Sequence, residues 1–169
     1  MAKEIERKFL VASDGWRAAA DDGATLRQAY IAAMEDRSVR VRIKNDNSAR
    51  MTVKIGRNAL VRDEFEYDIP LPDAEELCAL AIGIVIRKTR YRVSHEGFVW
   101  EVDVYDGAYS GLVVAEVEMR SADDDPSLPD WLGVEVTGDH RYSNQSLATE
   151  ALEIEAGGLL RINNEGAGI

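Results

Sequence analysis

The sequence has few of the residues that mark several common protein classes. Its single cysteine, Cys78, cannot form a disulfide within the chain, which favours a reducing cytoplasm. Its two histidines, His95 and His140, stand alone at no metal-ligand spacing, so we expect both at the surface. No apolar run approaches a membrane span, and the charged segment after Met1 leaves no room for a signal peptide.

Positive charge is also scarce. Lys and Arg number 20 against 31 Asp and Glu, which gives a net charge of −11. A surface with this excess repels nucleic acid and anionic membranes, so neither is expected as a partner. The 169 residues, 46% of them hydrophobic, suffice for one core. We expect a single domain over residues 1–156 and a frayed tail over residues 157–169.

What the sequence does contain is a series of short segments in which charged and apolar residues alternate. This period of two predicts strands with one ionic face and one largely apolar face. Eight strands are predicted, at roughly 3–11, 25–33, 36–45, 49–56, 62–69, 87–95, 98–106 and 112–120. Capping and breaker residues predict helices from about residue 13 to 20, over 73–81 and over 144–156, the last capped by Ser143 or Asn144.

The first segment, Glu4-Ile5-Glu6-Arg7-Lys8, is the most informative. On a strand, Glu4, Glu6 and Lys8 share one face, with the two carboxylates only about 6–7 Å apart. Ionised carboxylates this close repel each other unless a cation lies between them. Taken alone, however, the segment also fits an ordinary solvated strand face.

The other strands favour a functional interpretation, because each carries charge of one sign. An exposed sheet face normally mixes signs, since like charges opposite each other are destabilising. The acids of the ionic faces are Glu4, Glu6, Glu64, Glu66, Glu101, Asp103, Glu116 and Glu118. The bases are Lys8, Arg40, Arg42, Lys44, Lys54, Lys88, Arg90 and Arg92. Setting these eight and eight aside from 31 and 20 leaves 23 acids and 12 bases, so the exterior carries the negative excess.

Equal numbers of acids and bases on the inner faces predict a closed sheet with a wet interior, because so many charges could not be sustained in a dry core. Carboxylate rows suit a divalent cation, and Lys and Arg rows suit an oligoanion. The pattern therefore predicts a site for a metal-bound polyphosphate.

The chain resembles the CYTH, or triphosphate tunnel metalloenzyme, superfamily. The resemblance rests on motifs in the family's order: Glu4-Ile5-Glu6-Arg7-Lys8, Arg40-x-Arg42, Lys54, Glu64-Phe65-Glu66, Lys88-x-Arg90, Glu101-Val102-Asp103 and Glu116-Val117-Glu118. It implies a mainly β fold, an eight-stranded antiparallel β-barrel with short helices packed outside. The lumen would bind a triphosphate and one or two Mg²⁺ or Mn²⁺ ions. Short bacterial members that begin in this way resemble tripolyphosphatases, so hydrolysis of tripolyphosphate to diphosphate and phosphate is expected.

The site residues follow from the pattern and the resemblance together. We expect phosphate to be bound by Lys8, Arg40, Arg42, Lys44, Lys54, Arg90 and, through the segment that closes one end of the tunnel, Arg141. We expect the eight acids to form the metal-binding wall, from Glu4 to Glu118. The resemblance also implies a catalytic pair of Tyr30 and Lys88, although Tyr30 equally fits simple barrel packing.

Other functions remain open on the sequence. Class IV adenylyl cyclases share the tunnel but tend to carry a His-Phe pair before the first motif, where this chain has Met1-Ala2-Lys3. A thiamine triphosphatase would need a side chain that binds the thiazolium ring, and only Trp16 and Trp131 are candidates. A third alternative is a non-catalytic module that binds polyphosphate or nucleotide.

Overall fold

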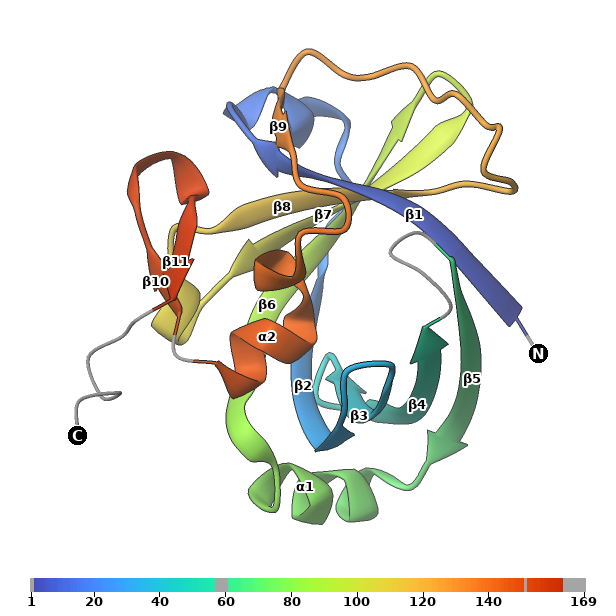
Figure 1. Cartoon of the computed structure of the whole chain (residues 1–169), viewed down its shortest axis with the longest axis vertical. Helices are drawn as coiled ribbons and strands as arrows, with labels where there is room; N and C mark the ends of the chain where they lie inside the picture. Colours follow the sequence, from blue (N-terminus) through green and yellow to red (C-terminus); the bar gives the residue numbers. More distant parts are fainter. Residues whose placement is uncertain (1, 57–60, 151, 163–169) are drawn as a thin grey trace.

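The computed structural model describes residues 2–56, 61–150 and 152–162 (Figure 1). Its framework is eight strands: β1 (Ala2–Val11), β2 (Ala24–Ala33), β3 (Arg37–Lys44), β4 (Ser48–Gly56), β5 (Val61–Ile69), β6 (Ile82–His95), β7 (Phe98–Tyr105) and β8 (Val113–Glu118). These match the predicted strands closely, except that β6 begins at Ile82 rather than near residue 87. The added stretch is apolar without alternation, so the charge pattern gave no sign of it.

The eight strands close into an antiparallel barrel, as expected. Hydrogen-bonded neighbours run β5, β4, β3, β2, β6, β7, β8 and β1, and β1 also pairs with β5. Residues 2–5 of β1 pair with β5, whereas residues 6–10 pair with β8. A short ninth strand, β9 (Leu132–Glu135), adds to β1 beyond the closure. A closed barrel has its two faces inside and outside, so the period-two pattern separates ionic from apolar side chains.

Much of the apolar core lies outside the barrel wall. One buried cluster lies beneath β9 and the 3₁₀ helix η1 (Asp14–Ala19), and it contains Phe9, Trp16, Val93, Trp100, Val102, Ala115, Val117 and Trp131. A second lies beneath helix α1 (Leu71–Ala79), the counterpart of the helix predicted over 73–81, and Cys78 packs against it. Trp16 and Trp131 are therefore packing residues, with exposures of 1% and 6%.

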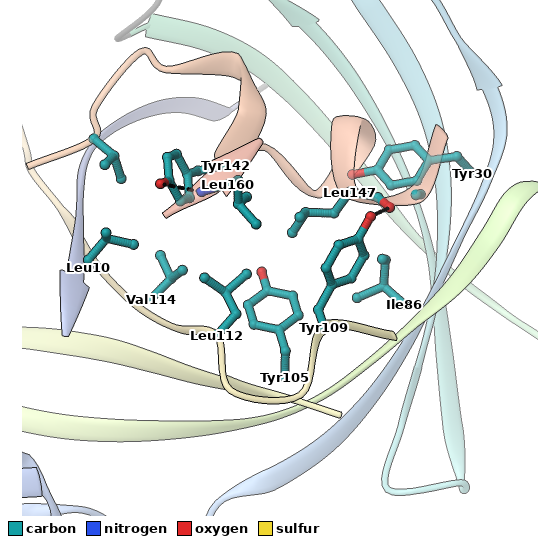
Figure 2. Packing of buried hydrophobic residues seen from close by; sticks show 12 residues of the cluster. Leu10, Tyr30, Ile86, Tyr105, Tyr109, Leu112, Val114, Tyr142, Leu147 and Leu160 are labelled. Atoms are coloured by element: carbon teal, nitrogen blue, oxygen red, sulfur yellow. Dashed lines mark hydrogen bonds between the residues drawn. The ribbon is translucent and has the colours of Figure 1, made fainter. Parts of the chain in front are cut away.

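One end of the barrel interior is filled by apolar side chains, which was not predicted from the sequence. Leu10, Ile86, Tyr105 and Val114 share strand parity with the lumen charges, and they pack with Tyr142, Leu147 and Leu160 from the C-terminal segment (Figure 2). The inner faces of β1, β6, β7 and β8 thus change from ionic to apolar along the strand, and we call this apolar end of the barrel the apolar plug. Burying these side chains against the C-terminal segment is favourable because it removes their apolar surface from water. The wet cavity occupies only the remaining part of the barrel.

The C-terminal region differs from the predicted helix over 144–156. Helix α2 covers only Asn144–Thr149, capped by Ser143, whose side chain accepts a hydrogen bond from the Ser146 amide. A hairpin of β10 (Leu152–Ile154) and β11 (Leu160–Ile162) follows, because Leu152-Glu153-Ile154-Glu155 alternates with the period of a strand. Residues 160–162 are thus ordered where a frayed tail was expected, and residues 163–169 lie outside the described part of the chain.

The remaining elements are short 3₁₀ turns: η2 (Gly107–Tyr109), η3 (His140–Tyr142) and η4 (Ala156–Gly158). Gly83 lets α2 approach β6 closely: its φ is +66°, and a Cβ there would lie 1.9 Å from the Ala148 carbonyl oxygen. Only glycine tolerates both conditions. None of the helices in the described residues has the length and apolarity needed to cross a membrane.

Candidate active site

The inner faces of the strands and the segment from Val136 to Ser146 enclose a cavity of about 1220 Å³, here called the tunnel. Most of the predicted lumen residues line it: Glu6, Lys8, Tyr30, Arg40, Arg42, Lys54, Glu64, Glu66, Arg90, Glu101, Glu116 and Glu118. The alternation of charged and apolar residues therefore identified the face of each strand correctly.

The basic side of the tunnel is built on β3. Arg40 is 5% exposed, and its buried Nε has no hydrogen-bond partner in the described residues. Arg42 donates from Nε to Oε1 of Gln28 at 2.7 Å. Burial, followed by the charges of Arg40 and Arg90, lowers the pKa of Arg42 to about 9. Within the described chain, neither arginine forms a salt bridge. Two poorly compensated guanidinium groups in a cavity form a site for an anion.

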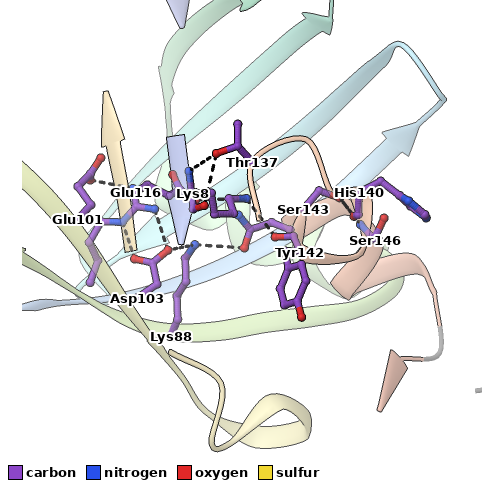
Figure 3. Close-up of polar contacts among 12 residues, drawn as sticks. Lys8, Lys88, Glu101, Asp103, Glu116, Thr137, His140, Tyr142, Ser143 and Ser146 are labelled. Atoms are coloured by element: carbon purple, nitrogen blue, oxygen red, sulfur yellow. Dashed lines mark hydrogen bonds and ion pairs between the residues drawn. The ribbon is translucent and has the colours of Figure 1, made fainter. Parts of the chain in front are cut away.

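The acidic side is built on β1 and β8. Glu6 and Glu118 lie opposite each other in register, and Lys8 lies opposite Glu116. The Lys8 ammonium is 3.4 Å from Oε1 of Glu116 (Figure 3). Burial alone would raise the pKa of Glu116, but Lys8 and Arg90 outweigh it and hold the pKa well below its usual range. Burial likewise lowers the pKa of Lys8, and Glu116 and Glu6 reverse that effect, so the net shift is upward. Both groups therefore stay charged at neutral pH.

The acidic residues have the chemistry needed for a divalent cation. Carboxylates facing each other across β1 and β8 repel unless a cation offsets their charge. Mg²⁺ and Mn²⁺ prefer such hard oxygen ligands, and Mg²⁺ keeps several of its waters, so a few carboxylates suffice. In the residues that the structure describes, no three acidic, histidine or cysteine side chains converge into a ready-made metal cluster. The donor set fits an ion held partly through water.

The family of the chain follows from its match to a family model. The model of the CYTH domain matches residues 2–152. The chain belongs to the CYTH family. A curated inorganic triphosphatase of Acetivibrio thermocellus is 45% identical over 148 residues, covering 87% of this chain and 94% of that protein. One of Nitrosomonas europaea is 37% identical over 150 residues, covering 86% and 96%. A crystal structure of an inorganic triphosphatase aligns with a TM-score of 0.63 and 36% identity, covering 85% of this chain and 96% of that one.

On the inner face of the barrel, between the CYTH tunnel and the apolar end, Asp103 binds two cations (Figure 3). Its Oδ2 is 2.6 Å from the Lys88 ammonium, and its Oδ1 accepts from Arg90 Nε at 2.7 Å. Asp103 is 1% exposed and Lys88 is also 1% exposed, so neither lines the tunnel. Burial lowers the pKa of Lys88 to about 7, because Asp103 only partly offsets burial and the charges of Arg90 and Arg42. Both Asp103 oxygens bond these two cations.

The expected pair of Tyr30 and Lys88 is only partly assembled. Tyr30 is 4% exposed and lines the tunnel at the edge of the apolar plug (Figure 2). Among the described residues, no hydrogen bond joins it to Lys88. Lys88 donates instead to Oδ1 of Asn144 at 3.2 Å, and the Tyr105 hydroxyl donates to the same oxygen at 2.8 Å. Neither Asn144 nor Tyr105 was predicted to lie in the site, because neither belongs to a row of alternating charges.

Two lysines, Lys8 and Lys88, donate hydrogen bonds to the C-terminal segment. The Lys8 ammonium donates to the Tyr142 carbonyl at 3.0 Å, as Lys88 does to the Asn144 side chain. Arg141, which the resemblance placed on phosphate, lies outside the tunnel lining. It bonds Asp139 at 2.6 Å and the Leu160 carbonyl at 2.8 Å, so it ties this segment to β11.

Three other predicted residues are not placed in the tunnel. Lys44 is exposed at the end of β3, and Arg92 is exposed on β6 in a smaller groove. The side chain of Glu4 lies outside the described part of the structure, although its backbone pairs with Arg62. Conversely, Arg50 and Arg62 line the tunnel and were missed. Arg50 lies on the same face of β4 as Lys54, and Arg62 lies on the same face of β5 as Glu64. Because Lys54 and Glu64 were predicted to face the lumen, the alternation alone could have identified Arg50 and Arg62.

Proposed function

We propose that this protein is a metal-dependent inorganic triphosphatase that hydrolyses tripolyphosphate to diphosphate and phosphate. The observation that carries the proposal is the placement of Arg40 and Arg42 in one cavity with Glu6, Glu116 and Glu118. Arg40 is nearly buried and Arg42 is half-buried, and neither forms a salt bridge with a carboxylate in the part of the chain that the structure describes. The names of the two curated relatives, which match 87% and 86% of this chain, support it.

Arg40 and Arg42 would bind the phosphate chain most strongly, because a planar guanidinium matches two phosphate oxygens. Lys8, Lys54 and Arg90 would assist, although each also faces a carboxylate. The Lys54 ammonium is 3.7 Å from Glu64, and Nη1 of Arg90 is 3.0 Å from Glu101. These pairs link neighbouring side chains of the tunnel wall.

Glu6, Glu116 and Glu118 would hold Mg²⁺ or Mn²⁺, with Glu64, Glu66 and Glu101 completing the acidic wall. When bound, the ion offsets charge on the phosphate oxygens and lowers the pKa of water. Phosphoryl transfer requires mainly positioning and charge neutralisation from a protein. The opposed basic and acidic walls are suited to both tasks.

At the chemical step, Tyr30 offers a hydroxyl on the tunnel wall, and Lys88 offers an amine that can lose its proton near neutral pH. We propose that the pair orients water and accepts its proton, with Asp103 and Asn144 fixing the position of Lys88. We also propose a cytoplasmic location, because the single cysteine, Cys78, cannot form a disulfide within the chain.

The alternatives differ in their products. A cyclase would release cyclic AMP from ATP. A thiamine triphosphatase would need an aromatic side chain that binds the thiazolium ring, and Trp16 and Trp131 are buried elsewhere. Incubation with tripolyphosphate, ATP and thiamine triphosphate in Mg²⁺, followed by product analysis, separates these functions. Phosphate released fastest from tripolyphosphate supports the proposal. No product from any substrate would indicate a binding module instead.

A further inference from the structure

Gln28 lies beside Arg42 and is completely buried. It is on β2, directly opposite Arg42 on β3, and its side chain is 0% exposed. Its Oε1 accepts the hydrogen bond from Arg42 Nε at 2.7 Å. Among the residues that the structure describes, Arg42 thus has a neutral amide as its acceptor and no carboxylate.

The choice of an amide has consequences for the charge of Arg42. A guanidinium has five N–H donors, of which the amide uses one, leaving the two Nη groups for a phosphate. A carboxylate at this position would bind the same guanidinium, offset its charge and compete with the substrate. A neutral acceptor fixes the orientation of the side chain without reducing its attraction for an anion.

The orientation of the amide follows from the same contact. Arg42 Nε can only donate, so Oε1 must face it and Nε2 must point away. That Nε2 is buried and has no partner within the described chain. An unmet buried donor costs stability, and the charge of Arg42 is itself disfavoured by burial. Local arrangements that lower stability are expected where function selects them.

We propose that Gln28 is a positioning residue, which directs the Arg42 guanidinium at a substrate phosphate and leaves its charge available. The proposal rests on the proposed function, since it identifies the anion as tripolyphosphate. It adds a residue from β2 that neither the charge pattern nor the tunnel lining reveals.

The test compares three variants. Gln28→Glu adds a carboxylate beside Arg42 with almost no change in shape, and Gln28→Met removes the acceptor without adding charge. Gln145→Glu is the control for added charge, because Gln145 also lines the tunnel but donates to the Met34 carbonyl rather than accepting from Arg42. KM and kcat are measured with tripolyphosphate and Mg²⁺. Melting temperatures are measured in EDTA with and without tripolyphosphate.

We expect Gln28→Glu to raise KM by roughly 10- to 100-fold, the worth of a charged hydrogen bond. It should also raise the melting temperature of the free protein and reduce the increase that tripolyphosphate produces. Gln28→Met should raise KM less, and Gln145→Glu least. Parental KM in a folded Gln28→Glu protein, or equal effects of the two Glu substitutions, would overturn the proposal.

If Gln28→Glu does not fold, the KM of Gln28→Met tests the proposal, and a parental KM for that variant overturns it. If the parent does not hydrolyse tripolyphosphate, the proposed function fails. The melting shift by tripolyphosphate then still tests Gln28: a smaller shift in Gln28→Glu supports its role, and an unchanged or absent shift overturns it.

Discussion

The Lys88 ammonium and Oδ2 of Asp103 are 2.6 Å apart, and both side chains are almost completely buried. Arg90 binds the same carboxylate through two of its nitrogens, at 2.7 and 2.9 Å. One acid on β7 thus binds two cations of β6, of which Arg90 lines the tunnel and Lys88 does not. Burial raises the pKa of Asp103, but Arg90 and Lys88 outweigh it, so the net shift is downward.

Removing this carboxylate charge should be strongly destabilising. Asp103→Asn would leave two buried cations short of their partner, which costs about 3–5 kcal/mol in comparable cases. Urea unfolding at pH 7 measures the change in the free energy of unfolding. Glu101→Gln is the matched control, because Glu101 also pairs with Arg90 but its side chain is 35% exposed, and it should cost about 1 kcal/mol or less. Equal losses would show that burial does not govern the network.

The same carboxylates predict how stability changes in acid. The pKa values of Asp103 and Glu116 are lower in the folded protein than in the unfolded chain. Unfolded carboxyls near pKa 4 therefore bind more protons than folded ones below about pH 5, and the free energy of unfolding should fall with pH there. Unfolding measured from pH 7 to 3 tests this. Asp103→Asn should show a shallower dependence than the parent, and an identical slope would remove Asp103 from the explanation.

Metal removal should abolish hydrolysis. EDTA should stop phosphate release from tripolyphosphate, and added Mg²⁺ or Mn²⁺ should restore it. Glu118→Gln should have the same effect at low Mg²⁺, because the amide keeps the shape of the side chain but loses its charge. Glu118 is exposed, so this variant should keep the parental melting temperature. Near-parental activity of the variant across Mg²⁺ concentrations would count against the acidic wall.

The sequence predicted the barrel well because closure imposes a simple rule on it. A strand whose inner face meets water must alternate, and the rows from Arg40, Lys54, Glu64 and Glu116 all do. Where the inner face is dry, as at Ile86, both faces are apolar and the period disappears. That is why the beginning of β6 and the apolar plug were not predicted.

The C-terminal region was predicted poorly for a related reason. The interval 144–156 contains helix formers and a good cap, yet Gly83 brings β6 against Ala148, and the chain leaves the helix after Thr149. A contact between segments this distant in sequence leaves no local pattern. Asn144 and Gln28 also left no local pattern, because their hydrogen-bond partners, Lys88 and Arg42, lie on other elements.

Arg42 and Tyr30 should affect different kinetic constants. If Arg42 binds phosphate as proposed, Arg42→Ala removes a contact made in both the ground and transition states, so it should mainly raise KM. Tyr30→Phe keeps the ring in the apolar plug and removes only the hydroxyl, so the protein should stay folded. If that hydroxyl acts on water as the bond breaks, kcat should fall more than KM rises. Initial rates over a range of tripolyphosphate concentrations separate the two effects, and parental kcat for Tyr30→Phe would reduce Tyr30 to packing.

Lys88 should impose a pH dependence on kcat. Its pKa is lowered to about 7, so the neutral amine becomes the major form as pH rises above that value. If the amine accepts a proton from water, kcat should increase through pH 7 and level off at higher pH. Lys88→Met should lower kcat on the order of 10²–10⁴-fold and remove this rise. Rates at saturating substrate from pH 6 to 9 test both expectations. A kcat that falls through pH 7 in the parent would instead indicate that Lys88 acts in its ammonium form, as a phosphate contact. The same pH profile in Lys88→Met would show that another group causes the pH dependence.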